Sequence, residues 1–569
     1  MKATLAALCC LVTLAQGASI IKNWHVGWVH NVNPDGLHPR RGIALNGHFP
    51  PQPLSVNSND YVAINFTNSF GDGSPSTLHG HGIYYNNTNY YDGAAGIVQC
   101  PVPDGHSFHY ELLNSPKSPS SAEKQIGTYW IHGHYKGQYI DGLRLPFIIH
   151  NADGETYQYD DDYTVALADW YHHVHADVLK NKYYKPNGTY PTADAGLMYF
   201  VHTRANQTAK NLEGFNENAT LPFEPGKTYR IRVVNMSAAS LFNFWIEGHD
   251  MKIIEVDGED VHPFPVDQLQ VSIGQRYSVL VKSHNTTKHN WKIHANLVPE
   301  MFDMYKPTDP IKLNLTSTLS YGNPHAKMGA GRGTVDSYEL FDDTQLEPVK
   351  KIPMVKPDMS VNRIATMPSY SDNIHRGTFD NKTFVAPLTP TLLTMMSEST
   401  SYIMNPATYG PNTNAVVAPH LQMIELVMIN FSDDMHPMHM HGSKFQVVNR
   451  ATDLRSKDPK ANPPIKEGQK NPMRRDTVVL PPGGAVTIRF RADNPGAWFL
   501  HCHMNFHLDV GMAMVVVQAP NMAAKRFDIP SYVKEQCKMQ HMPVSGNAGG
   551  IPHSSINFGN LTKAPLPEP

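Results

Sequence analysis

The segment His501-Cys502-His503, followed by His507 and Met512, carries side chains that could do redox chemistry. A thiolate, an imidazole and a thioether at this spacing suit one mononuclear copper ion, with the thioether as a weak axial ligand. Successive side chains of a strand face opposite sides, so Cys502 can bind one metal while His501 and His503 reach toward others. The segment therefore predicts an electron-accepting copper connected through one residue to a second copper site.

Further histidines complete both predicted sites. His436, which precedes the alternating pair His439 and His441, is the expected second imidazole of the mononuclear copper. The same alternating pair occurs twice nearer the N-terminus, as His79-Gly80-His81 and as His132-Gly133-His134. With His501 and His503 these pairs supply eight imidazoles, enough for three coppers with open positions for dioxygen or water. Such a cluster would reconcile one-electron donors with the four-electron reduction of O2.

The four motifs resemble the copper-binding segments of multicopper oxidases in order and type, and the similarity extends from about Asn23 to about Ala519. The resemblance implies four copper ions in each chain. It assigns the ligands as follows: type 1, His436, Cys502, His507 and Met512; type 2, His79 and His439; one type 3 copper, His81, His132 and His503; the other, His134, His441 and His501.

Carboxylates near the cluster are expected to orient ligands and deliver protons. The resemblance places Asp92 in this role, within Tyr91-Asp92-Gly93. Asn505 departs from the family, because many relatives carry an acidic residue at that position. A second proton-relay carboxylate is therefore not expected there.

A purely structural role is the alternative for each motif. An isolated His-x-His pair is more often a surface or core-edge pair than a metal site, and a lone buried cysteine is usually a small apolar side chain. Packing alone does not demand four such pairs, or a Cys502 flanked by two histidines. The combined pattern favours copper.

The N-terminus predicts a secreted protein. An apolar run follows Lys2 and closes with Ala15-Gln16-Gly17, so residues 1–17 are expected to be a signal peptide. The run is too short for a membrane span, and no later stretch is long and apolar enough, so we expect a soluble monomer outside the cell or in the cell wall. Family members often link their first and third domains by a disulfide, and we expect Cys100 and Cys537 to pair. Sequons such as Asn187-Gly188-Thr189 predict a glycosylated surface.

Composition limits the partners and the fold. The formal net charge of -3 with interleaved signs argues against nucleic acid, which leaves O2 and a small electron donor. Short alternating runs separated by Pro, Gly, Asn and Asp clusters predict an all-β chain, and the family fold implies three cupredoxin-like Greek-key β-sandwich domains. The expected segments are residues 18–153, 154–321 and 380–537 as domains, 322–379 as a connector and 538–569 as a C-terminal tail.

The electron donor is the open question. Asp169 in Asp169-Trp170-Tyr171-His172 and Asp303 after Glu300-Met301-Phe302 resemble segments that supply carboxylates in Fe(II) oxidases, whereas the position of a third carboxylate is Ser432. This substitution, and a C-terminus without the anchor of iron-importing relatives, favour a laccase-like oxidase of phenols or pigment precursors. A ferroxidase is the alternative.

Two further classes carry less weight. Met435, Met438, Met440, Met504 and Met514 crowd the copper motifs and suggest a cuprous oxidase, although methionine is also a flexible core filler. A copper-storage or inactive copper-binding protein would not need a cysteine flanked by two histidines.

Overall fold

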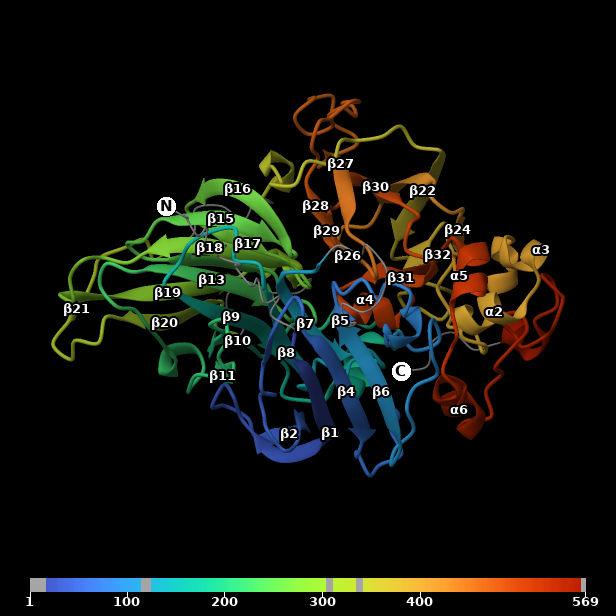
Figure 1. Ribbon diagram of the computed structural model, residues 1–569, viewed down its shortest axis with the longest axis horizontal. Coiled ribbons are helices and arrows are strands. Elements are labelled where there is room, and N and C mark those ends of the chain that lie inside the picture. Colours follow the sequence, from blue (N-terminus) through green and yellow to red (C-terminus); the bar gives the residue numbers. More distant parts are fainter. Residues whose placement is uncertain (1–16, 114–123, 303–310, 334–340, 564–569) are drawn as a thin grey trace, which may run out of the picture.

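The computed structural model describes residues 17–113, 124–302, 311–333 and 341–563. Its strands form six main sheets, arranged as three sandwiches that Figure 1 shows in blue, green and orange. The prediction of an all-β fold is therefore confirmed. The longest described helix has nine residues, and no described helix has the length and apolar character needed to cross a membrane.

The first sandwich pairs a sheet of order β2-β1-β4-β6 with one of order β3-β8-β7-β5. Every residue of β7 is buried, because this strand lies between the outer sheet and the rest of the molecule. The element bounds are β1 Ser19–Val32, β2 Arg40–Leu45, β3 Leu54–Asn57, β4 Tyr61–Asn68, β5 Leu78–His81, η1 Asn89–Tyr91, β6 Ser107–Leu113, β7 Gly127–Gly133 and β8 Arg144–His150.

The second sandwich pairs a seven-stranded sheet, β11-β10-β9-β13-β18-β15-β16, with a sheet of order β12-β20-β19-β14-β17, and β21 pairs with β19. The element bounds are β9 Asp161–Trp170, α1 His175–Val178, η2 Leu179–Tyr183, β10 Ala195–His202, β11 Lys210–Asn211, η3 Asn216–Asn218, β12 Thr220–Pro222, β13 Thr228–Asn235, β14 Phe242–Ile246, β15 Met251–Val256, β16 Glu259–Val266, β17 Leu269–Val271, β18 Arg276–Lys282, β19 His289–Leu297, η4 Pro299–Met301, β20 Asn314–Ser320 and β21 Lys327–Met328.

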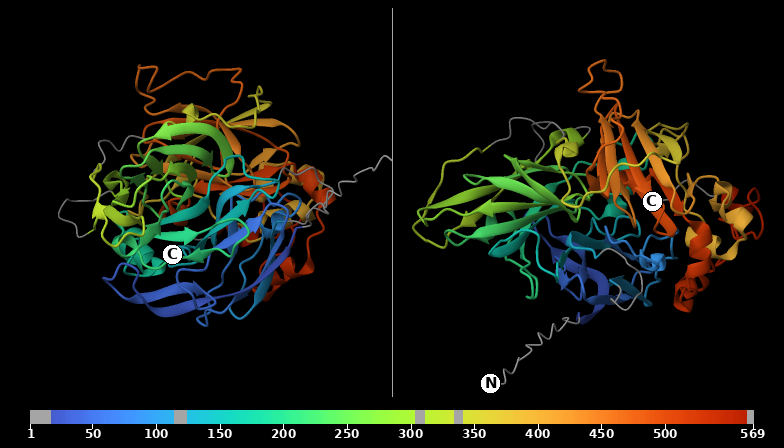
Figure 2. Two further views of the ribbon diagram at one scale, coloured as in Figure 1. Left: turned by 60° about the vertical axis from the view of Figure 1, so that its left-hand side comes forward. Right: turned by 45° about the horizontal axis from the view of Figure 1, so that its top comes forward.

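The third sandwich pairs β23-β22-β25-β30-β27-β28 with β24-β32-β31-β26-β29, and helices α2, α3, α5 and α6 gather at its outer edge (Figures 1 and 2). The element bounds are η5 Asp343–Gln345, β22 Met359–Thr366, β23 Thr378–Phe379, α2 Thr391–Ser397, α3 Thr400–Ile403, η6 Pro406–Tyr409, β24 Val416–Ala418, β25 Met423–Asn430, β26 His436–Met440, β27 Phe445–Ala451, β28 Arg474–Arg475, β29 Thr477–Leu480, β30 Ala485–Arg491, β31 Gly496–Cys502, α4 Asn505–Asp509, β32 Ala513–Gln518, α5 Pro520–Arg526, α6 Ser531–Met539 and η7 Gly559–Lys563.

One strand arrangement recurs in all three sandwiches. A parallel pair lies in one sheet of each, as β1 with β4, β9 with β13 and β22 with β25. A second parallel pair lies in the facing sheet, as β3 with β8, β12 with β20 and β24 with β32. The three sandwiches are thus built on one common strand arrangement.

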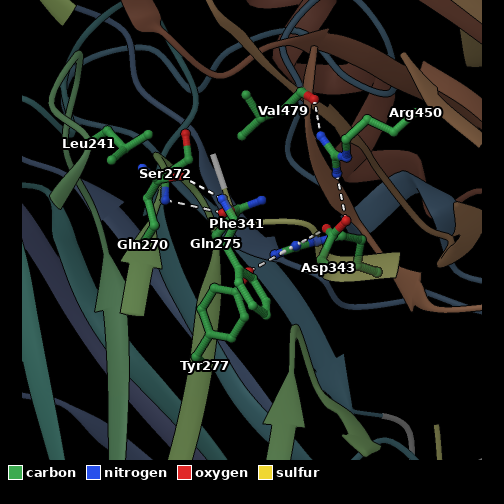
Figure 3. Close-up of a pocket in the computed structure, with 10 residues that line it drawn as sticks. Leu241, Gln270, Ser272, Gln275, Tyr277, Phe341, Asp343, Arg450 and Val479 are labelled. Carbon is green, nitrogen blue, oxygen red and sulfur yellow. Dashed lines mark hydrogen bonds and ion pairs between the residues drawn. The ribbon is translucent and has the colours of Figure 1, made fainter. Parts of the chain in front are cut away.

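The segment predicted as a connector, residues 322–379, also takes part in the fold. Its strand β22 pairs with β25 inside the third sandwich, because the alternating residues of Met359–Thr366 continue a sheet despite the surrounding Pro, Asp and Lys. Earlier in the segment, the buried carboxylate of Asp343 accepts hydrogen bonds from Arg450, at 2.6 Å, and from Arg475 (Figure 3). Residues 322–379 therefore contribute a strand and buried ion pairs to the third sandwich, in addition to connecting it to the second.

The C-terminal part of the chain is tied to the first sandwich. A disulfide joins Cys100 to Cys537 in α6, as predicted. The predicted boundary between residues 537 and 538 falls inside this helix. Beyond it, the backbone carbonyl of Ala548 accepts hydrogen bonds from Leu388 and Thr389 of the third sandwich. The described part of the tail therefore packs onto the protein.

Candidate copper sites

Strands of the first and third sandwiches bring the eight predicted cluster histidines together. In the first sandwich β5 pairs with β7, which sets His79 opposite His132. In the third, β26 pairs with β31, which sets His439 opposite His501. The two pairs of strands meet, because the ring of His79 stacks on that of His441 with centroids 3.9 Å apart. The ends of the polypeptide thus converge on one buried group of imidazoles.

Backbone carbonyls fix the orientation of four of these rings. The Nδ1 atoms lie within hydrogen-bond distance of carbonyl oxygens, and a carbonyl can only accept, so each Nδ1 carries the proton and each Nε2 keeps a lone pair. The four bonds are His79 to Asp92 (2.7 Å), His132 to Gly133 (3.0 Å), His439 to Asp476 (3.0 Å) and His501 to Cys502 (2.9 Å).

The free nitrogens of the cluster face one another. Nε2 of His79, His132 and His439 is buried without a hydrogen-bond partner among the described residues, a costly state that a bound metal would relieve. Other nitrogens lie close in pairs, with Nδ1 of His81 3.2 Å from Nε2 of His503 and Nε2 of His441 3.2 Å from Nε2 of His501. Burial lowers the pKa of His501 to about 3, which keeps this imidazole neutral and able to bind a metal.

Ligand-capable atoms fall into groups that resemble the predicted sets. Those of His134, His441 and His501 all lie within 4.8 Å of one another, as do those of His79, His439 and His441. For the set of His81, His132 and His503, the ring of His132 is centred 6.0 Å from His81 and 5.6 Å from His503. These groupings can accommodate three metal ions.

Asp92 lies between two of the cluster histidines. Its Oδ2 accepts a hydrogen bond from Nδ1 of His441 at 2.8 Å, and its Oδ1 lies 3.2 Å from Nδ1 of His79. The residue is fully buried. Asp92 therefore orients one ring from each of the two sandwiches, His441 through its carboxylate and His79 through its backbone carbonyl.

Asp476 is a second buried carboxylate at the cluster. Its Oδ1 lies 3.2 Å from Nε2 of His81, and its two oxygens accept from Arg276 of the second sandwich at 2.7 Å each. Burial alone would raise the pKa of Asp476, but Arg276 and the hydrogen bonds hold it well below the usual value. All three sandwiches thus contribute to the cluster, a link that no local motif reveals.

A mononuclear site lies around Cys502. The Sγ atom of Cys502 is 3.7 Å from Nδ1 of His436 and 3.7 Å from Nδ1 of His507, and these two nitrogens are 3.2 Å apart. Met512 lies beside them, since its carbonyl accepts from the Cys502 backbone amide at 3.0 Å. Gly377 permits this packing, because a Cβ there would lie 2.6 Å from that of Met512.

The chemistry of this group fits copper. Burial raises the pKa of the Cys502 thiol and lowers the pKa of His507 to about 3. A buried thiolate therefore needs a cation to offset its charge, and two neutral imidazoles with a thioether complete a set that soft copper prefers.

A cavity of about 390 Å³ reaches the histidine cluster from the side of α4. His134 and His503 line it, together with Asn505 and Asp509. Asn505 donates to Oδ2 of Asp509 at 2.7 Å, and the same oxygen lies 2.7 Å from Nε2 of His175. The carboxylate missing at Asn505 is thus present one helical turn later, beyond the reach of a position-by-position comparison.

A second cavity, of about 620 Å³, lies on the other side of the mononuclear site. Ser432 and Asp434 line it, with Ser432 Oγ 2.7 Å from Nε2 of His436 and Asp434 Oδ2 3.8 Å from Nε2 of His507. Each of these imidazoles therefore presents Nδ1 to Cys502 and Nε2 to the cavity side. One imidazole ring therefore separates this cavity from the sulfur of Cys502.

Three family models match most of the chain, each described as multicopper oxidase, over residues 28–154, 161–324 and 384–522. The iron multicopper oxidase fer1 of Mycosarcoma maydis is 48% identical, over 98% of this chain and 89% of the relative. The chain belongs to the multicopper oxidase family. It is a copper-dependent oxidoreductase, with type 1, type 2 and type 3 copper centres as its cofactors.

Two solved structures extend the comparison. The crystal structure of Fet3p, described as a multicopper oxidase that functions in iron import, matches this multicopper oxidase with a TM-score of 0.81 and 31% identity, covering 93% of this chain and 96% of that one. The laccase from Botrytis aclada matches with a TM-score of 0.77 and 25% identity, covering 92% of each chain. The fold is thus shared by oxidases of different donors.

Asp169 does not occupy the position predicted for it in this multicopper oxidase. The residue is fully buried at the end of β9, and its carboxylate accepts from the backbone amides of Ala238, Ala239 and Ser240 at 2.8, 2.8 and 3.1 Å. A carboxylate that closes a buried loop in this way does not line the 620 Å³ cavity beside His436 and His507. The prediction was wrong because the motif does not reveal which way the side chain points. Asp303, the other predicted carboxylate, lies outside the described residues.

The methionines that suggested a cuprous oxidase belong mainly to the core. Met438, Met440, Met504 and Met514 are each at most 2% exposed and pack among other apolar side chains. Met435 is partly buried against the same core. Their clustering near the copper motifs is explained by packing on the reverse faces of β26 and β32 and around α4.

Proposed function

We propose that this multicopper oxidase oxidises Fe(II) and couples the electrons to the reduction of O2 to water. From sequence alone a phenolic donor is favoured, and the relatives named for iron reverse that order. The observation that carries the proposal is the pair Asp433 and Asp434 in the cavity beside His436 and His507. Carboxylate oxygens are suited to a hard divalent cation, so Ser432 does not leave the cavity without acidic groups.

The residue assignments to copper are part of this proposal. His436, Cys502, His507 and Met512 would hold type 1 copper, His79 and His439 type 2 copper, and His81, His132 and His503 one type 3 copper. His134, His441 and His501 would hold the other. When bound, these coppers accept electrons singly and deliver four to O2. The support is geometric. Unpartnered nitrogens converge at the cluster, where carbonyls or carboxylates fix six of the rings, and the Nδ1 atoms of His436 and His507 face the Cys502 sulfur.

The cavity lined by Ser432, Asp433 and Asp434, termed the donor cavity, has the features needed to bind a cation. Asp433 and Asp434 place negative charge at its lining. This charge attracts the Fe(II) cation more strongly than an uncharged aromatic molecule. The imidazoles of His436 and His507 lie between this cavity and the Cys502 sulfur. The ring of Tyr190, which also lines the cavity, is centred 4.9 Å from that of His507 and packs against it.

The strand that carries Cys502 connects the two sites. His439 lies opposite His501 in the ladder of β26 and β31, and Met438 lies opposite Cys502. The side chain of Cys502 faces the donor side, whereas those of its neighbours His501 and His503 enter the cluster. An electron leaving the sulfur therefore crosses one peptide unit to reach a cluster ligand. We propose that Asp92, which holds His79 and His441, also supplies protons from its Oδ1 atom.

We also propose that the protein acts outside the cell or in the cell wall after removal of residues 1–17. The disulfide between Cys100 and Cys537 is consistent with an oxidising route. The expectation of a monomer stays a prediction.

The test compares donors on purified, copper-loaded enzyme. We expect kcat/KM for Fe(II) to exceed that for 2,6-dimethoxyphenol by at least about tenfold, since the carboxylates favour a cation. Faster phenol turnover would restore the laccase interpretation. Copper binding without O2 consumption from either donor would indicate an inactive copper-binding protein.

A further inference from the structure

Two sequons for N-linked glycosylation lie at the donor cavity. Gly188 and Thr189 of the Asn187 sequon line it, as does Asn381 of Asn381-Lys382-Thr383. The segment of Asn187 adjoins another part of the same rim, because its backbone amide donates to the carbonyl of Asn373 at 2.8 Å, two residues before the lining residue His375. Two predicted glycan acceptors from distant parts of the sequence are thus neighbours of one opening.

Both acceptor side chains are available for modification. Asn187 and Asn381 are exposed, and each has a positive φ, of 54° and 61°, which asparagine tolerates in turns. Neither side-chain amide has a hydrogen-bond partner among the described residues. An N-linked glycan on either residue would therefore extend into solvent at the rim without displacing a protein contact.

A third sequon at the same cavity shows the opposite behaviour. Asn430 of Asn430-Phe431-Ser432 is fully buried, and its Nδ2 donates to the carbonyls of Asp434 and Pro481 at 2.7 and 3.1 Å. This amide is used to shape the loop that carries Asp433 and Asp434. The sequon motif alone does not separate Asn430 from the other two, whereas burial does.

The rim also exposes an aromatic ring. Phe431 lines the cavity and is 64% exposed, so the bare protein offers a stacking face to an aromatic donor beside the two aspartates. A glycan at the rim would cover this face and narrow the opening. An Fe(II) ion is smaller than a substituted phenol, so a narrower opening would exclude the phenol first.

We propose that Asn187 and Asn381 carry N-linked glycans that restrict the donor cavity to small ions and exclude bulky aromatic donors. The donor class in this inference rests on the proposed ferroxidase function and on passage through a glycosylating secretory route. The protein part of the cavity supplies the charge that attracts the cation, and the sugars supply the size limit. Selectivity is then divided between the folded chain and its modification.

The experiment uses copper-loaded enzyme secreted from a glycosylating eukaryotic host. Intact glycopeptide mass spectrometry should find sugar on Asn187 and Asn381 and none on Asn430. In the double variant Asn187→Gln/Asn381→Gln, the ratio of kcat/KM for 2,6-dimethoxyphenol to that for Fe(II) should rise by about fivefold or more, because the aromatic donor gains access. The matched control is Asn285→Gln, which removes an exposed sequon away from the cavity lining and should leave the ratio unchanged.

A second measurement avoids any effect of the substitutions themselves. Wild-type enzyme trimmed by an endoglycosidase that leaves a single sugar should show the same direction of change. Unmodified Asn187 and Asn381, or a ratio in the double variant equal to that of Asn285→Gln, would overturn the inference. Failure to oxidise Fe(II) would instead overturn the proposed function, because glycan occupancy and the rise in kcat/KM for 2,6-dimethoxyphenol on its own are both measured without iron.

Discussion

The histidine cluster and the donor cavity lie on opposite sides of Cys502, and they are built differently. At the cluster, seven of the eight histidines are buried, and six of the rings are held by carbonyls, by Asp92 or by Asp476. At the donor cavity, Asp434 is 30% exposed and no rigid set of ligands surrounds the space among the described residues. The histidine cluster is therefore specified by many long-range contacts, whereas the donor cavity depends on a few side chains at a loop.

Removing the residue between the two regions should have the largest effect. We expect Cys502→Ser to lower donor-driven O2 consumption by roughly 10³-fold or more, because the thiolate that links the regions is lost. Copper analysis should show about one copper fewer in each chain, since the cluster ligands are untouched. Retained turnover would mean that electrons enter the cluster without passing through this residue, and the two regions would then be independent.

The rigidity of the cluster is tested by Asp476→Asn. The substitution leaves the buried Arg276 without its main partner, so we expect the free energy of unfolding to fall by about 3–5 kcal/mol. Copper affinity should fall by about 10–100-fold, because Asp476 also orients His81. Denaturant unfolding and metal titration measure the two effects. Unchanged stability would show that the second sandwich does not brace the cluster.

The cavity beside α4 predicts a pH dependence. Burial alone would lower the pKa of His175, but Asp509 and Asp141 raise it above its ordinary value in the folded protein. The stabilisation is therefore fully present below the unfolded pKa of about 6.5 and is lost as pH rises through the folded pKa. We expect His175→Gln to cost about 1.5–3 kcal/mol at pH 6 and less at pH 9, as measured by denaturant unfolding. A cost independent of pH would contradict the charged pair.

The smallest predicted effect concerns the donor cavity. Asp434→Asn should lower kcat/KM for Fe(II) by about tenfold and leave that for a phenol nearly unchanged, because only the cation depends on the charge. Asp169→Asn is the matched control, since its carboxylate binds backbone amides and should affect stability while leaving the donor ratio unaltered. If Asp169→Asn shifts the ratio of kcat/KM for Fe(II) to that for a phenol and Asp434→Asn does not, then Asp434 is not the carboxylate that serves Fe(II).

The two regions also differ in how well the sequence predicts them. The cluster histidines occur in compact motifs, and alternation along the chain from His501 to His503 predicts that Cys502 faces away from both histidines. The fold class follows from the short alternating runs and the turn residues between them. The long-range partners cannot be predicted from the sequence in this way. Asp476 of the third sandwich contacts His81 of the first, and Arg276, which binds Asp476, belongs to the second sandwich.

The donor side shows where motif comparison fails. Asp169 matches a motif, but its carboxylate points into a buried loop. At Asn505 and Ser432, comparison one position at a time finds no carboxylate, whereas Asp509 and Asp434 supply one within a turn. Side-chain direction and small shifts along a helix or loop are set by tertiary packing, which a single sequence does not display.

Coupling between the donor cavity and the histidine cluster is measured by the ratio of Fe(II) oxidised to O2 consumed, with both recorded together in one sealed cell. Coupling of the donor cavity to the cluster predicts about four Fe(II) for each O2, with no hydrogen peroxide released. A ratio of about two with accumulating peroxide would contradict complete reduction at the cluster. Iron oxidation that continues at the wild-type rate in Cys502→Ser would show that the donor cavity is not the point of entry.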